Sequence, residues 1–186
     1  RVIPARIFAH KDTGGRVELL LIRRIDLLTW EALVGGKRLL PGRKLQIEGG
    51  PAAEVIQSLA GSRRLVRFSE PIEPHLPQIG QMPLPPYIHE RLTDPERYQT
   101  VYARQPGSAA APTAGLHFTP ALLDRLQTLG IQFATVTLHV GLDTFAPVTE
   151  DDPLEHVIHT EWCEVTPEAA AAIAASRAAG GRVIAV

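Results

Sequence analysis

The sequence predicts a protein of mixed class, α/β plus all-β, in which a small closed β-barrel domain is joined to an α/β layered domain. Three observations support this: glycine-spaced apolar segments come first, a proline-rich stretch follows, and three helix-start motifs lie beyond it. With 45% hydrophobic and 21% charged residues in 186, the composition is ordinary for a globular protein. It excludes wholesale disorder, a collagen repeat and a coiled-coil rod.

Residues 1–70 contain six short β-prone segments separated by glycine turns such as Gly14-Gly15 and Gly49-Gly50. Short strands at about ten-residue spacing are typical of a small barrel. We expect strands at Val2–Ala9, Val17–Ile25, Trp30–Val34, Lys44–Glu48, Ala53–Leu59 and Leu65–Phe68.

The domain boundary is predicted in residues 71–88, which hold six prolines. Proline lacks a backbone N–H and fixes φ, so this stretch is neither regular helix nor central strand. We therefore expect the barrel domain at residues 1–75 and part of an α/β catalytic domain at residues 76–186.

Three helices are predicted from one start motif, which occurs at Asp94-Pro95, Thr119-Pro120 and Thr166-Pro167. In each, a side-chain oxygen can cap a free backbone N–H, and proline fits the first helical position. The second helix would place four leucines on one face and end at Gly130. Strands are expected at Ile131–Val140 and Arg182–Val186, which gives the helix–strand alternation of an α/β layer.

Charge is divided unevenly between the two parts. The net charge of −1 arises from about +5 in residues 1–75 and about −6 in residues 76–186. The basic part suits a polyanion, and its densest cluster consists of Lys37, Arg38, Arg43 and Lys44. No row of aromatic residues accompanies this cluster, so ordinary surface charge on a barrel is the alternative interpretation.

Cysteine usage, hydropathy and the ends of the chain give three further expectations. The lone Cys163 cannot form an internal disulfide, which fits a reducing cytoplasm. No apolar run reaches the roughly 18 residues of a membrane helix. Both ends are apolar, which indicates an internal fragment of a longer chain.

Four of the seven histidines lie between residues 117 and 159. His139 shares one face of its predicted strand with Gly141, at the carboxyl end where α/β sheets place ligands. His117 precedes a helix start and follows a turn containing Thr113 and Gly115, where the backbone can approach a ligand closely. The competing interpretations are a half-solvated strand and an ordinary loop.

His156, His159 and Glu161 form an H-x-x-H-x-E pattern. This pattern can supply metal ligands, a metal-free polar site or plain surface. It lacks the H-E-x-x-H spacing of zinc hydrolases.

Several longer strings together resemble the S-adenosylmethionine:tRNA ribosyltransferase-isomerase family of queuosine biosynthesis. The resemblance spans nearly the whole chain in the family's order. It rests on Arg1–Arg6 (RVIPAR), Met82–Ile88 (MPLPPYI), Glu96–Tyr102 (ERYQTVY), Pro112–Phe118 (PTAGLHF), Val136–Gly141 (VTLHVG), Thr144–Val148 (TFAPV) and the His156–Glu161 segment. Two departures are Asp143, where the family usually has a small residue, and Gly35-Gly36, where proline-glycine is expected.

The resemblance implies an α/β domain with an inserted β-barrel and a metal-free transferase reaction without a cofactor. The ribosyl group of S-adenosylmethionine would pass to the 7-aminomethyl-7-deazaguanine of a tRNA and be isomerised, giving epoxyqueuosine-tRNA, adenine and methionine. Histidine suits the proton transfers because its pKa lies near neutrality. We expect His117 and His139 to be catalytic.

The remaining site residues are expected in two groups. Substrate binding is assigned to Thr113, Gly115, Gly141, His156, His159 and Glu161, and tRNA binding to Lys37, Arg38, Arg43 and Lys44. We expect a cytoplasmic monomer that does not bind membranes. The alternatives are a non-catalytic RNA-binding module and a metal-dependent hydrolase using His156 and His159.

Overall fold

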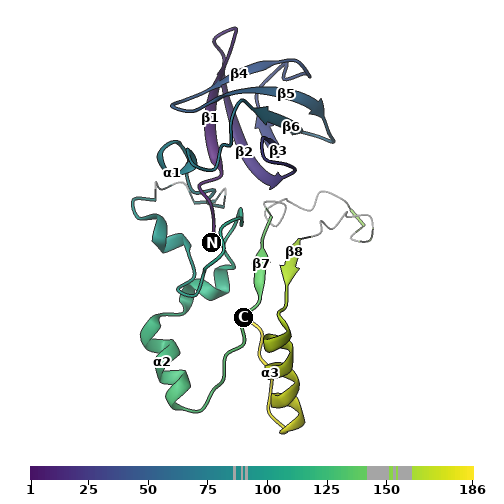
Figure 1. Cartoon of the computed structure of the whole chain (residues 1–186). Helices are drawn as coiled ribbons and strands as arrows, with labels where there is room; N and C mark the ends of the chain where they lie inside the picture. Colours follow the sequence, from purple (N-terminus) through teal and green to yellow (C-terminus); the bar gives the residue numbers. More distant parts are fainter. Residues whose placement is uncertain (86, 89, 91, 142–150, 153, 155–160) are drawn as a thin grey trace. The chain divides into compact units, whose positions relative to one another are not determined.

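The computed structural model describes residues 1–85, 87–88, 90, 92–141, 151–152, 154 and 161–186. The chain consists of two compact units, Val2–Leu92 and Thr93–Val186, with Arg1 grouped with the second. Their elements are labelled along the chain in Figure 1.

The first unit is a closed barrel of six antiparallel strands, as the sequence predicts. The strands pair in the order β1-β2-β3-β6-β5-β4, and β4 returns to β1. Residues 10–60, all of which are described, contain no helix. The strands are β1 Arg6–Lys11, β2 Arg16–Arg24, β3 Thr29–Gly35, β4 Lys44–Ile47, β5 Ala52–Ser58 and β6 Arg63–Phe68.

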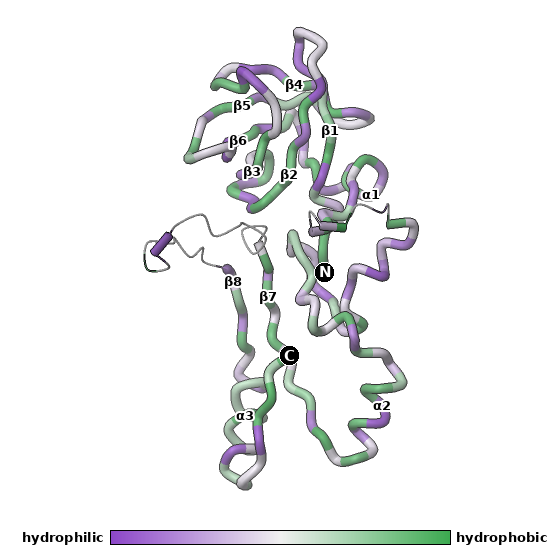
Figure 2. The backbone as a smooth tube through the Cα atoms, turned by 180° about the vertical axis from the view of Figure 1, so that it is seen from behind, coloured by the Kyte–Doolittle hydropathy of each residue, from purple (hydrophilic) through white to green (hydrophobic). Residues whose placement is uncertain are grey.

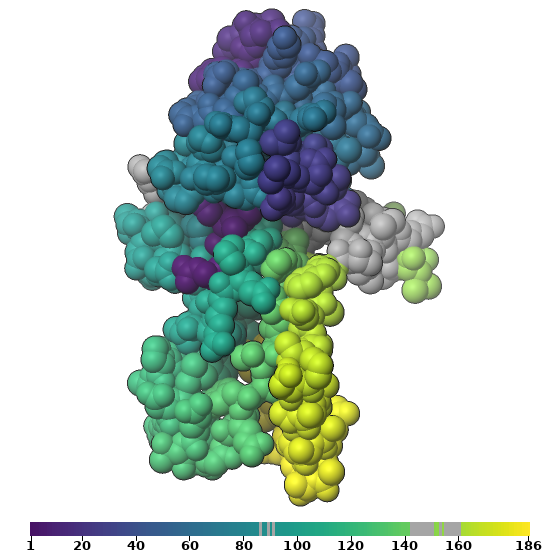
Figure 3. Space-filling view, in the orientation of Figure 1, coloured from purple at the N-terminus to yellow at the C-terminus, as the bar shows by residue number. Residues whose placement is uncertain are grey.

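Two-residue alternation gives the barrel its core. Ile7, Leu19 and Leu21 point inward and are fully buried, together with Val66 and Phe68. The residues between them face outward, and the tube in Figure 2 accordingly changes between apolar and polar along the strands. On the face shown in Figure 3, the atoms of the barrel form one continuous packed body.

The proline-rich stretch belongs to the barrel unit, so the division falls at Leu92/Thr93 and not at the expected residue 75. Ile72 and Leu76 are buried in the core cluster of the barrel. Gln81 exchanges two backbone hydrogen bonds with Arg6, of 2.8 and 3.1 Å. The stretch also contains a short helix, α1 (Leu76–Ile79), that the sequence did not predict. Proline prevented regular structure here without preventing packing onto the barrel.

The second unit combines helices with a two-stranded sheet, as expected for its α and β content. Its elements are the 3₁₀ helices η1 (Pro95–Tyr98) and η2 (Thr113–His117), the α-helices α2 (Pro120–Thr128) and α3 (Pro167–Ala178), and the antiparallel strands β7 (Thr137–His139) and β8 (Trp162–Glu164). All three predicted capping residues act as caps. Asp94 accepts from the N–H of Glu96, Thr119 from that of Leu122 and Thr166 from that of Ala169.

Three predicted elements differ from the structure. Asp94-Pro95 begins a four-residue 3₁₀ helix and not an α-helix. Of the strand predicted at Ile131–Val140, only Thr137–His139 pairs, and residues 182–186 form no strand. A strand requires a neighbour for its hydrogen bonds, and within the described residues neither 131–136 nor 182–186 has one. The leucine face of α2 likewise carries no buried residue.

Candidate functional site

His139 is positioned by the pairing of β7 with β8. In this antiparallel ladder His139 lies directly opposite Trp162. Their ring centroids are 4.8 Å apart with an interplanar angle of 39°, which is close enough for the two rings to pack. His139 and Thr137 are half-buried, whereas Leu138 between them is exposed. The polar face of β7 is therefore the sheltered one.

The backbone of Gly107 forms a wall against the His139 ring. A Cβ added at Gly107 would lie 2.7 Å from His139 Cε1 and 3.1 Å from Nδ1. Gly107 also has φ +137°, a conformation that side chains disfavour. Glycine is thus required here both by its backbone and by the imidazole beside it.

Ser108 joins this wall to the end of β7. Its Oγ accepts from the N–H of Val140 at 2.9 Å and donates to the carbonyl of Ala110 at 2.7 Å. The N–H of Ala109 donates to the Val140 carbonyl at 2.9 Å. Ser108 and Ala110 are both buried. The segment beside His139 is therefore fixed by hydrogen bonds on both of its strands.

Burial lowers the pKa of His139 below its ordinary value of 6.5. Removal of the ring from water disfavours the charged imidazolium. Its Nε2 is buried and has no hydrogen-bond partner among the described residues. At neutral pH the ring is therefore an uncharged imidazole with one unsatisfied polar nitrogen, which is a state suited to accepting or donating a proton.

Gly141 and Glu161 are brought together beyond the paired strands. The N–H of Gly141 donates to Glu161 Oε1 at 2.9 Å. A Cβ at Gly141 would stay 3.8 Å from that oxygen, so the contact does not itself demand glycine. Two of the predicted substrate-binding residues thus lie next to each other, two residues from His139 along the chain.

The Thr113–His117 motif packs elsewhere in this unit. Gly115 is buried, and a Cβ there would lie 2.3 Å from the hydroxyl oxygen of Tyr102. The Tyr102 ring meets Phe118 edge-on at 6.5 Å, and burial raises the pKa of Tyr102. The close approach predicted at Gly115 is therefore made by a side chain of the protein.

The structure separates the two predicted catalytic histidines. His117 ends η2 and is exposed, and no hydrogen bond, ion pair or ring contact joins it to His139 within the described residues. Thr113 is also exposed. His156 and His159 lie outside the described residues. Of the predicted site, the structure places His139, Gly141 and Glu161 close together.

Three contributors to the candidate site were missed by sequence reasoning: Gly107, Ser108 and Trp162. Gly107-Ser108 precedes an alanine run and resembles an ordinary turn in sequence. The pairing of His139 with Trp162 depends on a register between segments more than twenty residues apart. No short motif encodes such a register, although the presence of one of only two tryptophans just after the H-x-x-H-x-E pattern was an available clue.

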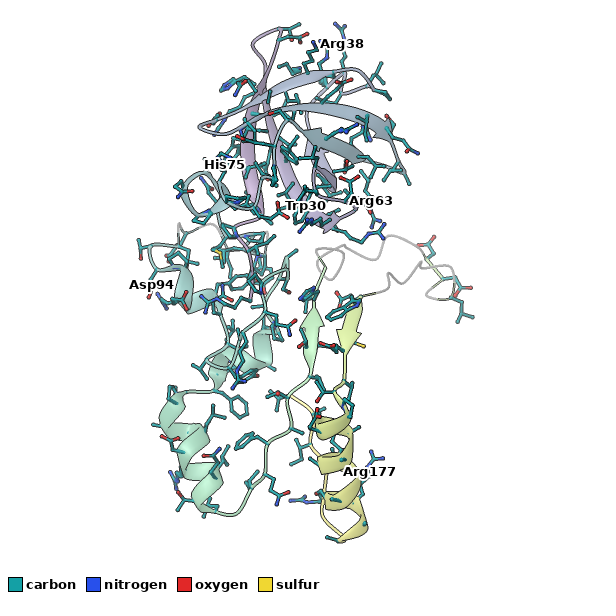
Figure 4. The ribbon with its side chains drawn as sticks, viewed as in Figure 1. Trp30, Arg38, Arg63, His75, Asp94 and Arg177 are labelled. Carbon is teal, nitrogen blue, oxygen red and sulfur yellow. The ribbon has the colours of Figure 1, made fainter. Side chains whose placement is uncertain are left out.

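The predicted tRNA-binding cluster lies on the barrel, where Lys37, Arg38 and Lys44 are exposed. Arg38 projects from one end of the barrel, and Trp30 and Arg63 lie toward the other (Figure 4). Arg43 is half-buried, and its Nη1 lies 2.6 Å from Asp12 Oδ1. Part of the positive charge of Arg43 is thereby offset.

No group of three or more metal-ligating side chains gathers within the described residues. The described helices are also all too short or too polar to cross a membrane.

Comparisons with known proteins address the family of the chain. A sequence model of the family described as "Queuosine biosynthesis protein" matches residues 1–186. The S-adenosylmethionine:tRNA ribosyltransferase-isomerases of Symbiobacterium thermophilum, Pelotomaculum thermopropionicum and Staphylococcus haemolyticus are 51%, 52% and 48% identical. Each alignment covers 100% of this chain and 56% of the relative, so the chain spans just over half the length of these curated relatives.

A solved structure is also similar, that of the S-adenosylmethionine tRNA ribosyltransferase from Thermotoga maritima. It shares 25% identity at a TM-score of 0.37, over 98% of this chain and 46% of that one. The match of the family model to every residue, together with relatives near 50% identity, establishes the family. The chain belongs to the queuosine biosynthesis protein family, as the sequence strings predicted.

Proposed function

We propose that this chain forms part of an S-adenosylmethionine:tRNA ribosyltransferase-isomerase. The observation that carries the proposal is the similarity to enzymes of that name over all of its residues. The reaction would transfer the ribosyl group to the aminomethyl group of 7-aminomethyl-7-deazaguanine in tRNA and isomerise it. Adenine and methionine would leave, and the product would be epoxyqueuosine-tRNA.

The reaction calls for proton transfers near neutral pH. The positive sulfonium acidifies the adjacent C5′ protons, the attacking amine must be neutral, and departing adenine benefits from a proton. An imidazole can perform each of these transfers. We assign one of them to His139, because its depressed pKa keeps it neutral and its Nε2 has no described partner.

The other site assignments remain parts of this proposal. Glu161 and Gly141 would bind substrate beside His139, a role supported by their hydrogen bond. His156 and His159 would line the same site, since they precede Glu161 by five and two positions. His117 and Thr113 are exposed at η2 and would act on the part of the substrate that reaches that segment. Gly115 would contribute by fixing Tyr102 against η2.

The proposed partner is tRNA, held by its phosphates at Lys37, Arg38, Arg43 and Lys44. Exposed lysine and arginine bind phosphates without regard to sequence, and residues 1–75 carry the positive net charge of the chain. S-adenosylmethionine serves as ribosyl donor, and we propose that no metal or further cofactor takes part. A cytoplasmic monomer fits this role.

Adenine release tests the proposal. A full-length enzyme that contains this chain is incubated with S-adenosylmethionine, with and without tRNA that carries 7-aminomethyl-7-deazaguanine, and free adenine is measured by chromatography. We expect adenine only when that tRNA is present. A non-catalytic RNA-binding module would bind the tRNA and release no adenine. A metal-dependent hydrolase would lose its activity in chelator, whereas the proposed enzyme keeps it.

A further inference from the structure

We propose that a shallow hollow on the outer wall of the barrel binds one unpaired nucleobase of RNA, preferring a base with an exocyclic amino group. This inference rests on the proposed function, because it assumes an RNA partner. It adds a base-binding site to a surface for which the sequence indicated only phosphate contacts.

The hollow lies where three neighbouring strands are in register. Phe8 on β1 pairs with Glu18 on β2, and Glu18 pairs with Gly35 on β3. All three face outward, because their strand neighbours Ile7, Ala9, Val17 and Leu19 are buried. Since Gly35 has no side chain, a space of about 330 Å³ opens beside Phe8, Arg16, Val17, Glu18 and Gly35. This is at the lower end of the range for small-molecule sites.

One wall of the hollow offers a stacking surface. The guanidinium carbon of Arg16 lies 4.0 Å from the centre of the Phe8 ring. Its Nε lies 3.1 Å from Glu48 Oε1, so the guanidinium is held in place without a bound ligand. Unpaired RNA bases stack on aromatic rings and on arginine planes. The Phe8–Arg16 pair supplies both kinds of surface on the outside of a barrel whose interior is already packed.

The floor of the hollow offers an acceptor at the edge of such a base. Glu18 Oε1 is 3.1 Å from Arg6 Nε, which orients the carboxylate while its side chain stays about half exposed. A carboxylate accepts hydrogen bonds from the exocyclic amino group of cytosine, and adenine and guanine also carry an amino group. Uracil has none and presents carbonyl oxygens to the carboxylate. The hollow should therefore favour cytosine over uracil.

Positive charge borders the same end of the barrel. Lys11 Nζ donates to the carbonyl of Lys37 at 3.2 Å, which places that ammonium over the loop that follows Gly35. Lys37 and Arg38 continue the loop and are exposed. A base in the hollow would thus have cations close by for its phosphate. The acidic side chains Glu18 and Glu48 are each matched with an arginine, so they do not repel the strand as free charges would.

The test fills the hollow. Gly35 is outside the left-handed region, and a Cβ there would lie 3.8 Å from Glu18 Cβ, so Gly35→Leu adds a side chain without backbone strain. Phe8→Leu keeps an apolar residue but removes the stacking ring. Gln57→Leu is the matched control, since it adds the same leucine to an exposed position of β5. Binding of cytidine and uridine RNA hexamers is measured by fluorescence anisotropy at several salt concentrations, in the full-length enzyme.

We expect the parent enzyme to bind the cytidine hexamer more tightly than the uridine hexamer. Gly35→Leu and Phe8→Leu should each weaken cytidine binding by about 5- to 150-fold, the range for loss of one stacked base. The salt slope should stay unchanged because no phosphate contact is lost. Gln57→Leu should bind as the parent does, and circular dichroism should show the barrel intact in all variants.

Parental affinity in both hollow variants, or equal binding of the two hexamers, would overturn the inference even if the enzyme modifies tRNA. Hexamer binding that depends on the hollow in a protein that releases no adenine would instead support the inference and refute the proposed reaction. Absence of any RNA binding would refute both.

Discussion

The imidazole of His139 has a backbone wall on one side and an aromatic ring on the other, and its pKa is depressed by burial. If it transfers a proton, His139→Ala should lower the turnover of the full-length enzyme by about 10²- to 10⁴-fold. His139→Gln should not restore turnover, because glutamine does not titrate near neutrality. His75→Gln is the control, since His75 pairs with Glu70 in the other unit. Near-parental turnover in His139→Gln would transfer the proton-transfer role to His117, His156 or His159.

The depressed pKa of His139 also fixes the direction of a pH effect. The folded enzyme holds His139 neutral until the pH falls below 6.5, whereas the unfolded chain binds a proton at about pH 6.5. The unfolded state therefore binds more protons in that window, and the contribution of His139 to stability is lost as pH decreases. A base role for His139 predicts turnover that is maintained at pH 6.5 and falls only at lower pH.

Gly107 should be intolerant of a side chain. Gly107→Ala places a Cβ 2.7 Å from His139 Cε1 at φ +137°, so we expect a loss of about 1–3 kcal/mol in the free energy of unfolding and a displaced imidazole. Gly130→Ala is the matched control, because Gly130 also has positive φ but open space around it. Urea unfolding measures both changes. An equal loss in the two variants, with normal turnover in Gly107→Ala, would mean that His139 is not held by this wall.

The elements of the second unit begin where the sequence indicates, because a helix start is a local event. Thr119 and Thr166 each accept a hydrogen bond from an N–H three residues later, at 3.1 and 3.2 Å. Thr119→Ala and Thr166→Ala should each reduce the free energy of unfolding by about 1 kcal/mol, and serine at either position should restore most of it. Urea unfolding that is unchanged by both alanine variants would contradict the capping role.

Strands were predictable only where the sequence also implies a partner. The barrel segments alternate apolar and polar residues between short turns, so each strand has its neighbour nearby along the chain. Ile131–Val140 has strand-like composition, but only Thr137–His139 finds a partner, and that partner lies more than twenty residues away. For the same reason His139 was predictable as a candidate, whereas its contacts with Gly107 and Trp162 were not. Phe8 was read as part of an apolar stretch, and the pairing of β1 with β2 places it outside the barrel.

At the scale of the whole molecule, charge separates the two parts of the chain, and this predicts where tRNA phosphates bind. Changing Lys37, Arg38, Arg43 and Lys44 to alanine should weaken tRNA binding and reduce its dependence on salt, because fewer counterions are released. Arg43 is already paired with Asp12, so Arg43→Ala alone should contribute least. Filter binding between 50 and 200 mM salt, roughly the range where such contacts lose most affinity, gives the slope. An unchanged slope in the fourfold variant would place the tRNA elsewhere.

The central claim is that this chain belongs to an enzyme that moves a ribosyl group from S-adenosylmethionine onto tRNA. The most direct measurement is mass spectrometry of tRNA nucleosides after the full-length enzyme has acted on S-adenosylmethionine labelled with ¹³C in its ribose. The claim predicts that the labelled ribose carbons appear in the 7-deazaguanosine nucleoside as epoxyqueuosine, and that the label is absent when His139 is replaced by alanine. A tRNA that gains no labelled carbons, while adenine and S-adenosylmethionine remain joined, would contradict it.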